Sequence, residues 1–297
     1  MAADIINKLK HKYKHGSVLM RFIYINLAFF VVIKVISLFT TLFNIYSFDL
    51  ITILGVPSGI NMLLNRIWTL FTYMFVHEQI LHILFNMLWL YWFGKIFLQY
   101  FTGRVFGSLY VLGGLGGALL YILAFNYIPY FASMDRSWMI GASASVMAIV
   151  MGAAFYRPDV KLNLFLIGPI KIVYIAIAAF IIDFLSLGNG INEGGHVAHI
   201  GGAIIGYLFA MQYKNGKDIT AWVGKLIDWF VNLTKPRKSK KSKMKVKYKR
   251  NETDMEYNER KNNEQDEIDA ILDKLKTSGY NGLSSDEKRK LFDASKK

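Results

Sequence analysis

Six apolar runs, each close to the length that crosses a lipid bilayer, limit what this chain can fold into. The runs occupy roughly residues 21–43, 78–97, 105–127, 140–156, 167–187 and 195–213. An α-helix rises about 1.5 Å per residue, so about 20 residues cross the roughly 30 Å of bilayer hydrocarbon. Cysteine is absent, which excludes disulfides and thiolate chemistry. The sequence therefore predicts an all-α polytopic membrane protein whose six transmembrane helices form one bundle.

The positive charges predict how this bundle is oriented. Lysine and arginine are frequent before the first run and in the connections from run two to three and from run four to five. The residues on that side are Lys8, Lys10, Lys12, Lys14, Arg21, Lys95, Arg104, Arg157 and Lys161, against Arg66 and Arg136 on the other. Because short cytoplasmic loops hold the excess of basic residues, we expect both termini in the cytoplasm. The expected location is the cell (inner) membrane.

The segments around the runs divide the chain further. We expect a cytoplasmic basic N-terminus at 1–20, a membrane domain at 21–215, an amphipathic juxtamembrane helix at 216–234, a basic then acidic linker at 235–265 and a helical hairpin at 266–297. Ser284 and Glu287 have the spacing of a capping box at the start of the second hairpin helix. The connection at 44–76 is too apolar for a solvated loop, so we expect it to lie in the membrane interface.

The net charge of +14 comes mainly from one stretch of the tail. Residues 235–250 ("KPRKSKKSKMKVKYKR") hold ten Lys and Arg and no acid, which leaves +4 for the rest of the chain. Beside a membrane, each cation gains about 1 kcal/mol from anionic headgroups. We therefore expect this stretch to contact anionic lipid headgroups, and we favour that over its rival, nucleic-acid binding. The hairpin leaves room for an unknown cytoplasmic partner.

Polar residues gather near the starts of the second, fourth and sixth runs. With a cytoplasmic N-terminus these three runs all enter from outside, and residue counts place His82 and Ser143 about 10 Å below the outer surface. Ser143 is the candidate nucleophile and His196 its general base. Asn86, His82 and the backbone N–H of Ser143 would stabilise an oxyanion. The sequence thus outlines a hydrolytic site that opens to the extracytoplasmic side.

Small residues would let the helices that bear this site approach closely. Ala144, Ala148 and Gly152 recur at four-residue spacing in the fourth run, and Ala198, Gly202 and Gly206 do so in the sixth. Small-xxx-small faces allow close helix packing in membranes. Gly141 leaves space for the backbone to approach a substrate carbonyl.

In three motifs the sequence resembles the rhomboid family of intramembrane serine proteases, over about residues 60–210. "HILFN" at 82–86 is similar to the family's His-x-x-x-Asn, "GAS" at 141–143 to its Gly-x-Ser, and "HVAHIGG" at 196–202 to its histidine motif, with the first histidine as the base. The resemblance implies a Ser143–His196 dyad without a carboxylate and without a cofactor. It also implies cleavage of the transmembrane segments of other proteins near the outer surface.

Two positions depart from the family pattern. Ala144 replaces the glycine that usually follows the serine, and Met147 replaces an aromatic residue that often stacks on the histidine. Alanine is the smallest possible change, and methionine can still pack on an imidazole. We expect these departures to affect rate and specificity rather than activity itself.

Other interpretations of the same residues stay open. Ser145 competes as nucleophile but lies about 200° around the helix from Ser143. His199 is expected to hydrogen-bond neighbouring helices, and His77 to brace the outer connection. A metal site is not expected, because His196 and His199 lack an evident third ligand.

The two intramembrane charges and two further function classes also stay open. Asp183 could orient a histidine, although a structural hydrogen-bond network is favoured, and Lys34 is expected to snorkel or to face the bundle interior. A non-catalytic rhomboid relative could bind or escort membrane segments. A carrier or channel would need polar residues through the full membrane depth, whereas here they gather in the outer third.

Overall fold

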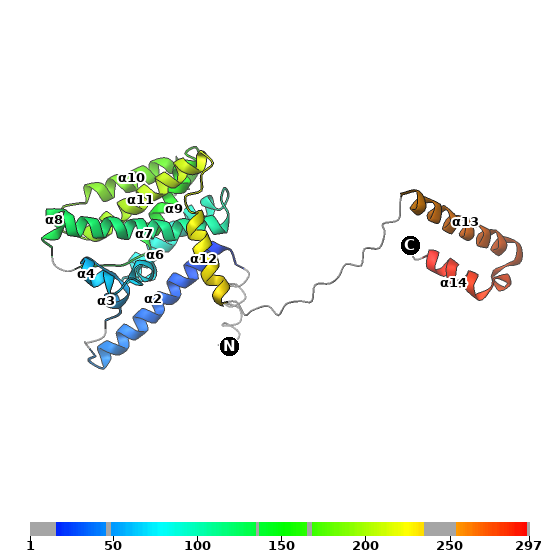
Figure 1. The fold of residues 1–297 in the computed structure, drawn as a ribbon, viewed down its shortest axis with the longest axis horizontal. Helices are drawn as coiled ribbons and strands as arrows, with labels where there is room; N and C mark the ends of the chain where they lie inside the picture. Colours follow the sequence, from blue (N-terminus) through cyan, green and yellow to red (C-terminus); the bar gives the residue numbers. More distant parts are fainter. Residues whose placement is uncertain (1–15, 46–48, 135–136, 165–167, 235–253, 296–297) are drawn as a thin grey trace. The chain divides into compact units, whose positions relative to one another are not determined.

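The computed structural model describes residues 16–45, 49–134, 137–164, 168–234 and 254–295, which belong to two compact units at 1–236 and 237–297. The long helices of the first unit are α2 (Val18–Leu42), α6 (Ile80–Phe97), α7 (Gly103–Tyr127), α9 (Ser143–Tyr156), α10 (Ile172–Leu185), α11 (Glu193–Lys214) and α12 (Ala221–Thr234) (Figure 1). The predicted basic segments up to residue 15 and at 235–250 lie outside the described residues.

Short elements connect these helices. They are α3 (Leu50–Leu54), β1 (Val56–Pro57), α4 (Ile60–Leu64), α5 (Thr69–Thr72), η1 (Tyr73–Phe75), α8 (Pro129–Ala132), β2 (Trp138–Met139), β3 (Lys161–Leu164) and β4 (Gly168–Lys171). β1 pairs antiparallel with β2, with Val56 opposite Met139, and β3 pairs antiparallel with β4 as a hairpin. The hydrophobic pattern did not predict these short strands.

Each of the six apolar runs contains a helix, but the helices differ in length. Within the described residues, α2, α6, α7 and α11 are long and apolar enough to cross a membrane. The other two, α9 and α10, are apolar but have 14 residues each, which cover about 21 Å at 1.5 Å per residue. The protein is therefore a helical membrane protein, and the described part of the chain contains four helices of full spanning length.

Small residues bring α7, α9 and α11 into backbone contact at the centre of the bundle. A Cβ atom on Gly202 would collide with the carbonyl oxygen of Ala144, and one on Gly206 with that of Ala148. On α7, a Cβ on Gly117 would come within 2.6 Å of Ala144 Cβ and 2.8 Å of the Ala198 carbonyl oxygen. The predicted small faces on the fourth and sixth runs therefore meet each other.

Buried polar contacts fix the neighbouring elements to this centre. Tyr73 donates its hydroxyl hydrogen to the carbonyl of Gly114 at 2.7 Å, and Tyr110 donates to the carbonyl of Met74 at 3.0 Å. Asn26 of α2 donates to the Tyr110 hydroxyl at 3.4 Å. Each bond satisfies a group that would be costly to leave unpaired in an apolar interior. Together they join α2 and η1 to α7.

The connection at 44–76 is partly a packed element of the core. Val56, Tyr73, Met74 and Val76 are almost completely inaccessible to solvent. The same connection also exposes large apolar side chains, which are Ile45, Leu64, Ile67, Trp68 and Phe71. Its apolar character thus arises from burial against the bundle as well as from an outward-facing surface.

The structure also bears on the expectations for Lys34 and for the amphipathic segment that follows the sixth run. Lys34 is exposed on α2 and lies 5.9 Å from the centre of the Phe30 ring, so it does not face the bundle interior. The predicted amphipathic segment forms α12, whose exposed apolar residues are Trp222, Leu226, Trp229, Phe230 and Leu233. α12 also packs on α7: a Cβ on Gly224 would lie 3.1 Å from Ser108 Oγ, and Asp228 forms an ion pair with Arg104 at 2.6 Å.

The second unit is the predicted helical hairpin. It consists of α13 (Asp254–Ser278), η2 (Tyr280–Gly282) and α14 (Ser285–Ala294), and the Ser284–Glu287 capping box is confirmed. The acidic part of the predicted linker was wrong, because α13 already begins at Asp254. Glu, Lys, Arg and Gln are good helix formers, and the Arg260–Glu264 pair supports this part of the helix.

We predict that Gly202→Ala destabilises the membrane unit. The new methyl group would collide with the Ala144 carbonyl, and overpacking of this kind costs about 1–3 kcal/mol. Thermal unfolding in detergent should show a lower midpoint. Gly59→Ala is the control, because a Cβ there meets nothing within 4 Å, and equal midpoints for the two variants would contradict the packing described above.

We predict that the pKa of the Glu287 carboxyl lies far below its ordinary value of 4.5. Lys274 hydrogen-bonds the carboxylate at 2.9 Å and the Ser284 N–H does so at 2.6 Å, which lowers the pKa of Glu287 to about 2. A depressed folded-state pKa stabilises the hairpin above pH 4.5, and that contribution is lost as the pH falls through about 2.

A titration of the Glu287 carboxyl followed by NMR measures this shift. Lys274→Met should raise the midpoint toward 4.5. Lys276→Met removes a lysine that pairs with Asp273 instead, so it should leave the midpoint in place. A midpoint near 4.5 in the unmodified chain would show that the described contacts do not hold the carboxylate.

Candidate active site

The loop before α9 is held in a conformation that aims Ser143 into a cavity. Gly141 has a φ of +119°, which side-chain-bearing residues rarely adopt, and its N–H donates to the Tyr73 carbonyl at 3.0 Å. The Ala142 N–H donates to Nε2 of buried His77 at 3.3 Å. His77 therefore braces the backbone next to Ser143, and Ser143 is the first residue of α9.

His82 and Asn86 come from α6 and face the same point. A Cβ on Gly141 would lie only 2.8 Å from His82 Cε1 and 3.7 Å from Ser143 Oγ, so the imidazole packs directly against the glycine. Asn86 is one helical turn further along α6, and its Nδ2 donates to the His82 carbonyl at 2.9 Å. The first three N–H groups of a helix have no intrahelical partners, and Ser143 is the first residue of α9. Hydrogen-bond donors thus converge beside the Ser143 hydroxyl.

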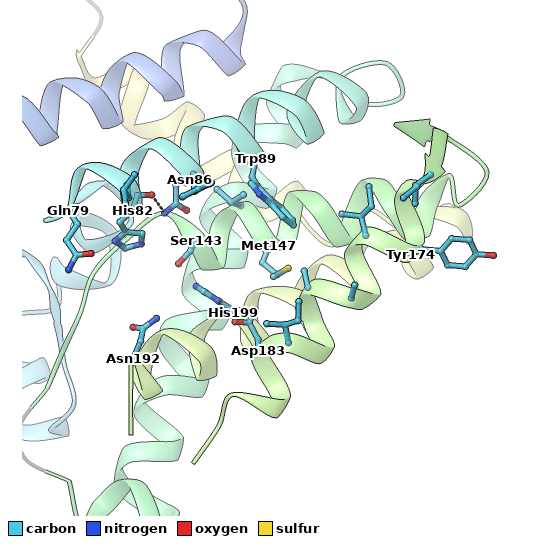
Figure 2. Close-up of a pocket in the computed structure, with 18 residues that line it drawn as sticks. Gln79, His82, Asn86, Trp89, Ser143, Met147, Tyr174, Asp183, Asn192 and His199 are labelled. Atoms are coloured by element: carbon cyan, nitrogen blue, oxygen red, sulfur yellow. Dashed lines mark hydrogen bonds and ion pairs between the residues drawn. The ribbon is translucent and has the colours of Figure 1, made fainter. Parts of the chain in front are cut away.

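A cavity of about 750 Å³ contains these groups. Its polar lining residues are Gln79, His82, Asn86, Ser143, Asp183, Asn192 and His199. The rest of its wall is mainly apolar, chiefly from α6 and α10. It includes Phe85 and Trp89 of α6, Tyr174 and Ile182 of α10, and Met147 of α9. In Figure 2 the Ser143 hydroxyl points toward the His199 ring, and Met147 lies one turn further along α9.

Of the two histidines on α11, His199 and not His196 lines this cavity among the described residues. The reason is helix phase. At about 100° per residue, His199 lies about 20° around α11 from Gly206, which contacts α9, whereas His196 lies about 80° away. The expectation that His196 faces Ser143 must therefore be revised in favour of His199. The spacing of His199, Gly202 and Gly206 was a signal in the sequence that would have identified it.

Asp183 of α10 joins both histidines. Its Oδ1 lies 2.8 Å from Nδ1 of His196 and 2.8 Å from Nδ1 of His199. The Asp183 side chain is 11% exposed and the two imidazoles are 18% and 19% exposed. The hydrogen-bond network expected for Asp183 thus exists, and it involves the two histidines of α11.

The same three groups have the composition of a metal site. Their ligand atoms lie within 4.8 Å of one another, so Asp183 supplies the third group that was not evident in the sequence. Each oxygen–nitrogen distance of 2.8 Å is also that of an ordinary hydrogen bond. Hydrogen bonding therefore accounts for the cluster without an ion.

Ser145 lies on a different side of α9 from the cavity. It is 1% exposed, and a Cβ on Gly114 of α7 would lie 2.8 Å from its Oγ. This oxygen has no hydrogen-bond partner among the described residues. Ser145 therefore packs against α7, and Ser143 is the serine that is accessible from the cavity.

Glu193 fastens the loop between α10 and α11 at one end of the cavity. Its carboxylate accepts hydrogen bonds from the N–H of Gly188 at 3.0 Å, the N–H of Gly190 at 2.7 Å and the hydroxyl of Tyr130 at 3.1 Å. Asn192, with a φ of 50°, lines the cavity from the same loop. Glu193 and Asn192 were not singled out in the sequence, because their roles depend on how this loop folds back.

Comparison with known proteins decides the family. The Rhomboid domain model matches residues 64–215, about half of the chain, and this range includes every cavity residue named above. The chain belongs to the rhomboid family. Residues 251–297, which contain the hairpin, match a family of unknown function (DUF6576).

Two curated rhomboid relatives are similar to about half of this chain. The mitochondrial RHOMBOID-like protein 12 of Arabidopsis thaliana is 28% identical over 52% of this chain and 48% of its own length. The rhomboid protease GlpG of Haemophilus influenzae is 29% identical over 49% of this chain and 69% of its own length. The chain thus spans about half the length of the Arabidopsis relative. The resemblance to rhomboids is confirmed at the level of family.

Proposed function

We propose that this rhomboid is an intramembrane serine endopeptidase in which Ser143 is the nucleophile and His199 the general base. The observation that supports this most directly is that both side chains line one cavity, with His82 and Asn86 beside them. A rhomboid relative that is named as a protease adds support. The proposal retains Ser143 from the sequence and replaces His196 by His199.

The reaction would follow the chemistry of an activated serine. Ser143 Oγ attacks the carbonyl carbon of the scissile peptide bond while its proton passes to Nε2 of His199. The tetrahedral intermediate collapses, the carbon–nitrogen bond breaks, and His199 returns the proton to the leaving amine. Water then attacks the acyl-enzyme with His199 again as base, which releases the acid and restores Ser143.

The negative charge on the intermediate needs donors placed in advance. The backbone N–H of Ser143, at the start of α9, combines an unpaired donor with the positive end of the helix dipole. The Asn86 side chain and His82 border the same space. We assign these three groups to the oxyanion site.

The apolar wall of the cavity suits a membrane-embedded substrate. Side chains of α6 and α10 form it, including Phe85, Trp89 and Ile175. We propose that transmembrane segments of other proteins enter between these helices, with all six helices crossing the bilayer and the site open to the extracytoplasmic side. The cytoplasmic partners would be anionic headgroups at 235–250 and an unidentified protein at the hairpin.

We predict that Ser143→Ala abolishes activity whereas Ser145→Ala retains it. Only Ser143 is accessible from the cavity, and loss of a nucleophile costs at least about a thousandfold in rate. Labelling by a fluorophosphonate probe and cleavage of reconstituted transmembrane peptides measure the effect. Both variants should remain folded. Full cleavage by the Ser143→Ala chain, or a folded unmodified chain that neither labels nor cleaves, would favour the alternative of a non-catalytic rhomboid that binds membrane segments.

We predict opposite outcomes for the two histidines of α11. His199→Ala should lower labelling and cleavage by at least about a thousandfold, because it removes the base. His196→Ala is a matched control that removes an imidazole bonded to the same Asp183 oxygen, and its rate should stay within about tenfold of the unmodified chain. The reverse pattern would restore the assignment of the base to His196.

A further inference from the structure

The carboxylate of Asp183 lies between two imidazoles in a segment that is otherwise apolar. It is the only acidic residue of α10, and it borders the cavity. Resting on the proposed function, we propose that Asp183 is a positioning residue, which orients the His199 ring for proton transfer from Ser143. The site would then act as a Ser–His–Asp arrangement, and not as the dyad without a carboxylate that the resemblance to the family implied.

The hydrogen bond determines which nitrogen of His199 is free. An ionised carboxylate only accepts hydrogen bonds, so Nδ1 of His199, at 2.8 Å from Asp183 Oδ1, must bear the hydrogen. In a neutral imidazole the lone pair is then on Nε2. In Figure 2 Asp183 lies at one edge of the His199 ring and Ser143 at the opposite edge. The lone pair of Nε2 thus faces the hydroxyl from which a base takes the proton.

The carboxylate of Asp183 needs compensation where it lies in an apolar helix. A charged side chain in a transmembrane helix is costly unless partners compensate it. Asp183 is compensated by two N–H donors on one oxygen. When His199 takes the proton from Ser143, the adjacent negative charge stabilises the imidazolium that forms. The same hydrogen bond therefore orients the base before the reaction and stabilises its charged form during the reaction.

His196 offers a second explanation for Asp183. In this explanation the carboxylate serves only to hold His196, and its bond to His199 has no role in the reaction. The two explanations differ in the effect they predict for removal of His196. If Asp183 acts through His199, His196→Ala leaves the Asp183–His199 bond and the orientation of the base in place.

The test is Asp183→Asn, which keeps the shape and removes the charge. The amide can donate to Nδ1, which shifts the His199 hydrogen to Nε2 and blocks its role as base. The reaction with a fluorophosphonate probe measures the effect. Its maximal inactivation rate constant, kinact, should fall by at least about a hundredfold, while the constant for reversible probe binding, KI, changes by less than about threefold. The ¹⁵N shifts of the His199 ring should report the Nδ1–H tautomer in the unmodified chain and the Nε2–H tautomer in the variant. The ¹⁵N signals that are lost in His199→Ala identify the His199 ring.

Three controls separate positioning from folding. Asp183→Glu keeps a carboxylate at this position, so its kinact should be higher than that of Asp183→Asn. Glu193→Gln neutralises another buried carboxylate, one that bonds the loop and Tyr130, and should leave the His199 tautomer unchanged. His196→Ala should also keep the Nδ1–H tautomer.

Several results would overturn the proposal, and the first two do not require the Asp183 variant to fold. An Nε2–H tautomer of His199 in the unmodified chain at neutral pH is one, and a switch to that tautomer in His196→Ala is another. An unchanged kinact in folded Asp183→Asn is a third. Loss of activity on treatment with EDTA that Zn²⁺ restores would assign the three groups to a metal instead. In each case, labelling of Ser143 in the unmodified chain would still support the proposed protease.

Discussion

The rest of the membrane unit depends on one contact, in which the backbones of α9 and α11 touch directly without side chains between them. Gly202 and Gly206 place the backbone of α11 against the carbonyl groups of Ala144 and Ala148. Any larger residue at these glycines would separate the helices by the thickness of a side chain. Because Ser143 and His199 lie near one end of this contact, backbone packing rather than flexible side chains determines how far apart α9 and α11 hold these two residues.

The two flanks of α9 are packed very differently, and this difference separates its two serines. Toward α7, glycines allow a tight contact in which Ser145 is enclosed. Toward α6 and α10, bulky side chains border an open volume of about 750 Å³ that reaches Ser143. The same helix thus packs tightly on one face and presents the Ser143 hydroxyl to the cavity on the other. The Gly141 turn and buried His77 maintain that orientation from outside the helix.

The helices and their contacts could be predicted from the sequence, but the residues that meet in the candidate site could be predicted only in part. The apolar runs located the helices, the small-residue spacing located their contact, and Ser284 with Glu287 located the start of α14. The expectation that His196 lines the cavity with Ser143 was wrong, because it followed a motif and ignored the phase of α11 relative to Gly206. The pairing of Asp183 with both histidines could not be derived, because residues on α10 and α11 meet only through the fold of the intervening loop. The burial of Tyr73 and Met74 likewise depends on partners from α7.

The shortness of α10 has a consequence for the surrounding lipid. With 14 residues it covers about 21 Å, well under the roughly 30 Å of a typical hydrocarbon core. Its exposed side chains that do not line the cavity include Ile181, Phe184 and Leu185. If α10 crosses the bilayer as proposed, its short length creates hydrophobic mismatch, which the bilayer relieves by thinning. In the proposed function, thinning beside α10 would shorten the distance that water and the peptide bond of a substrate segment must travel to reach Ser143.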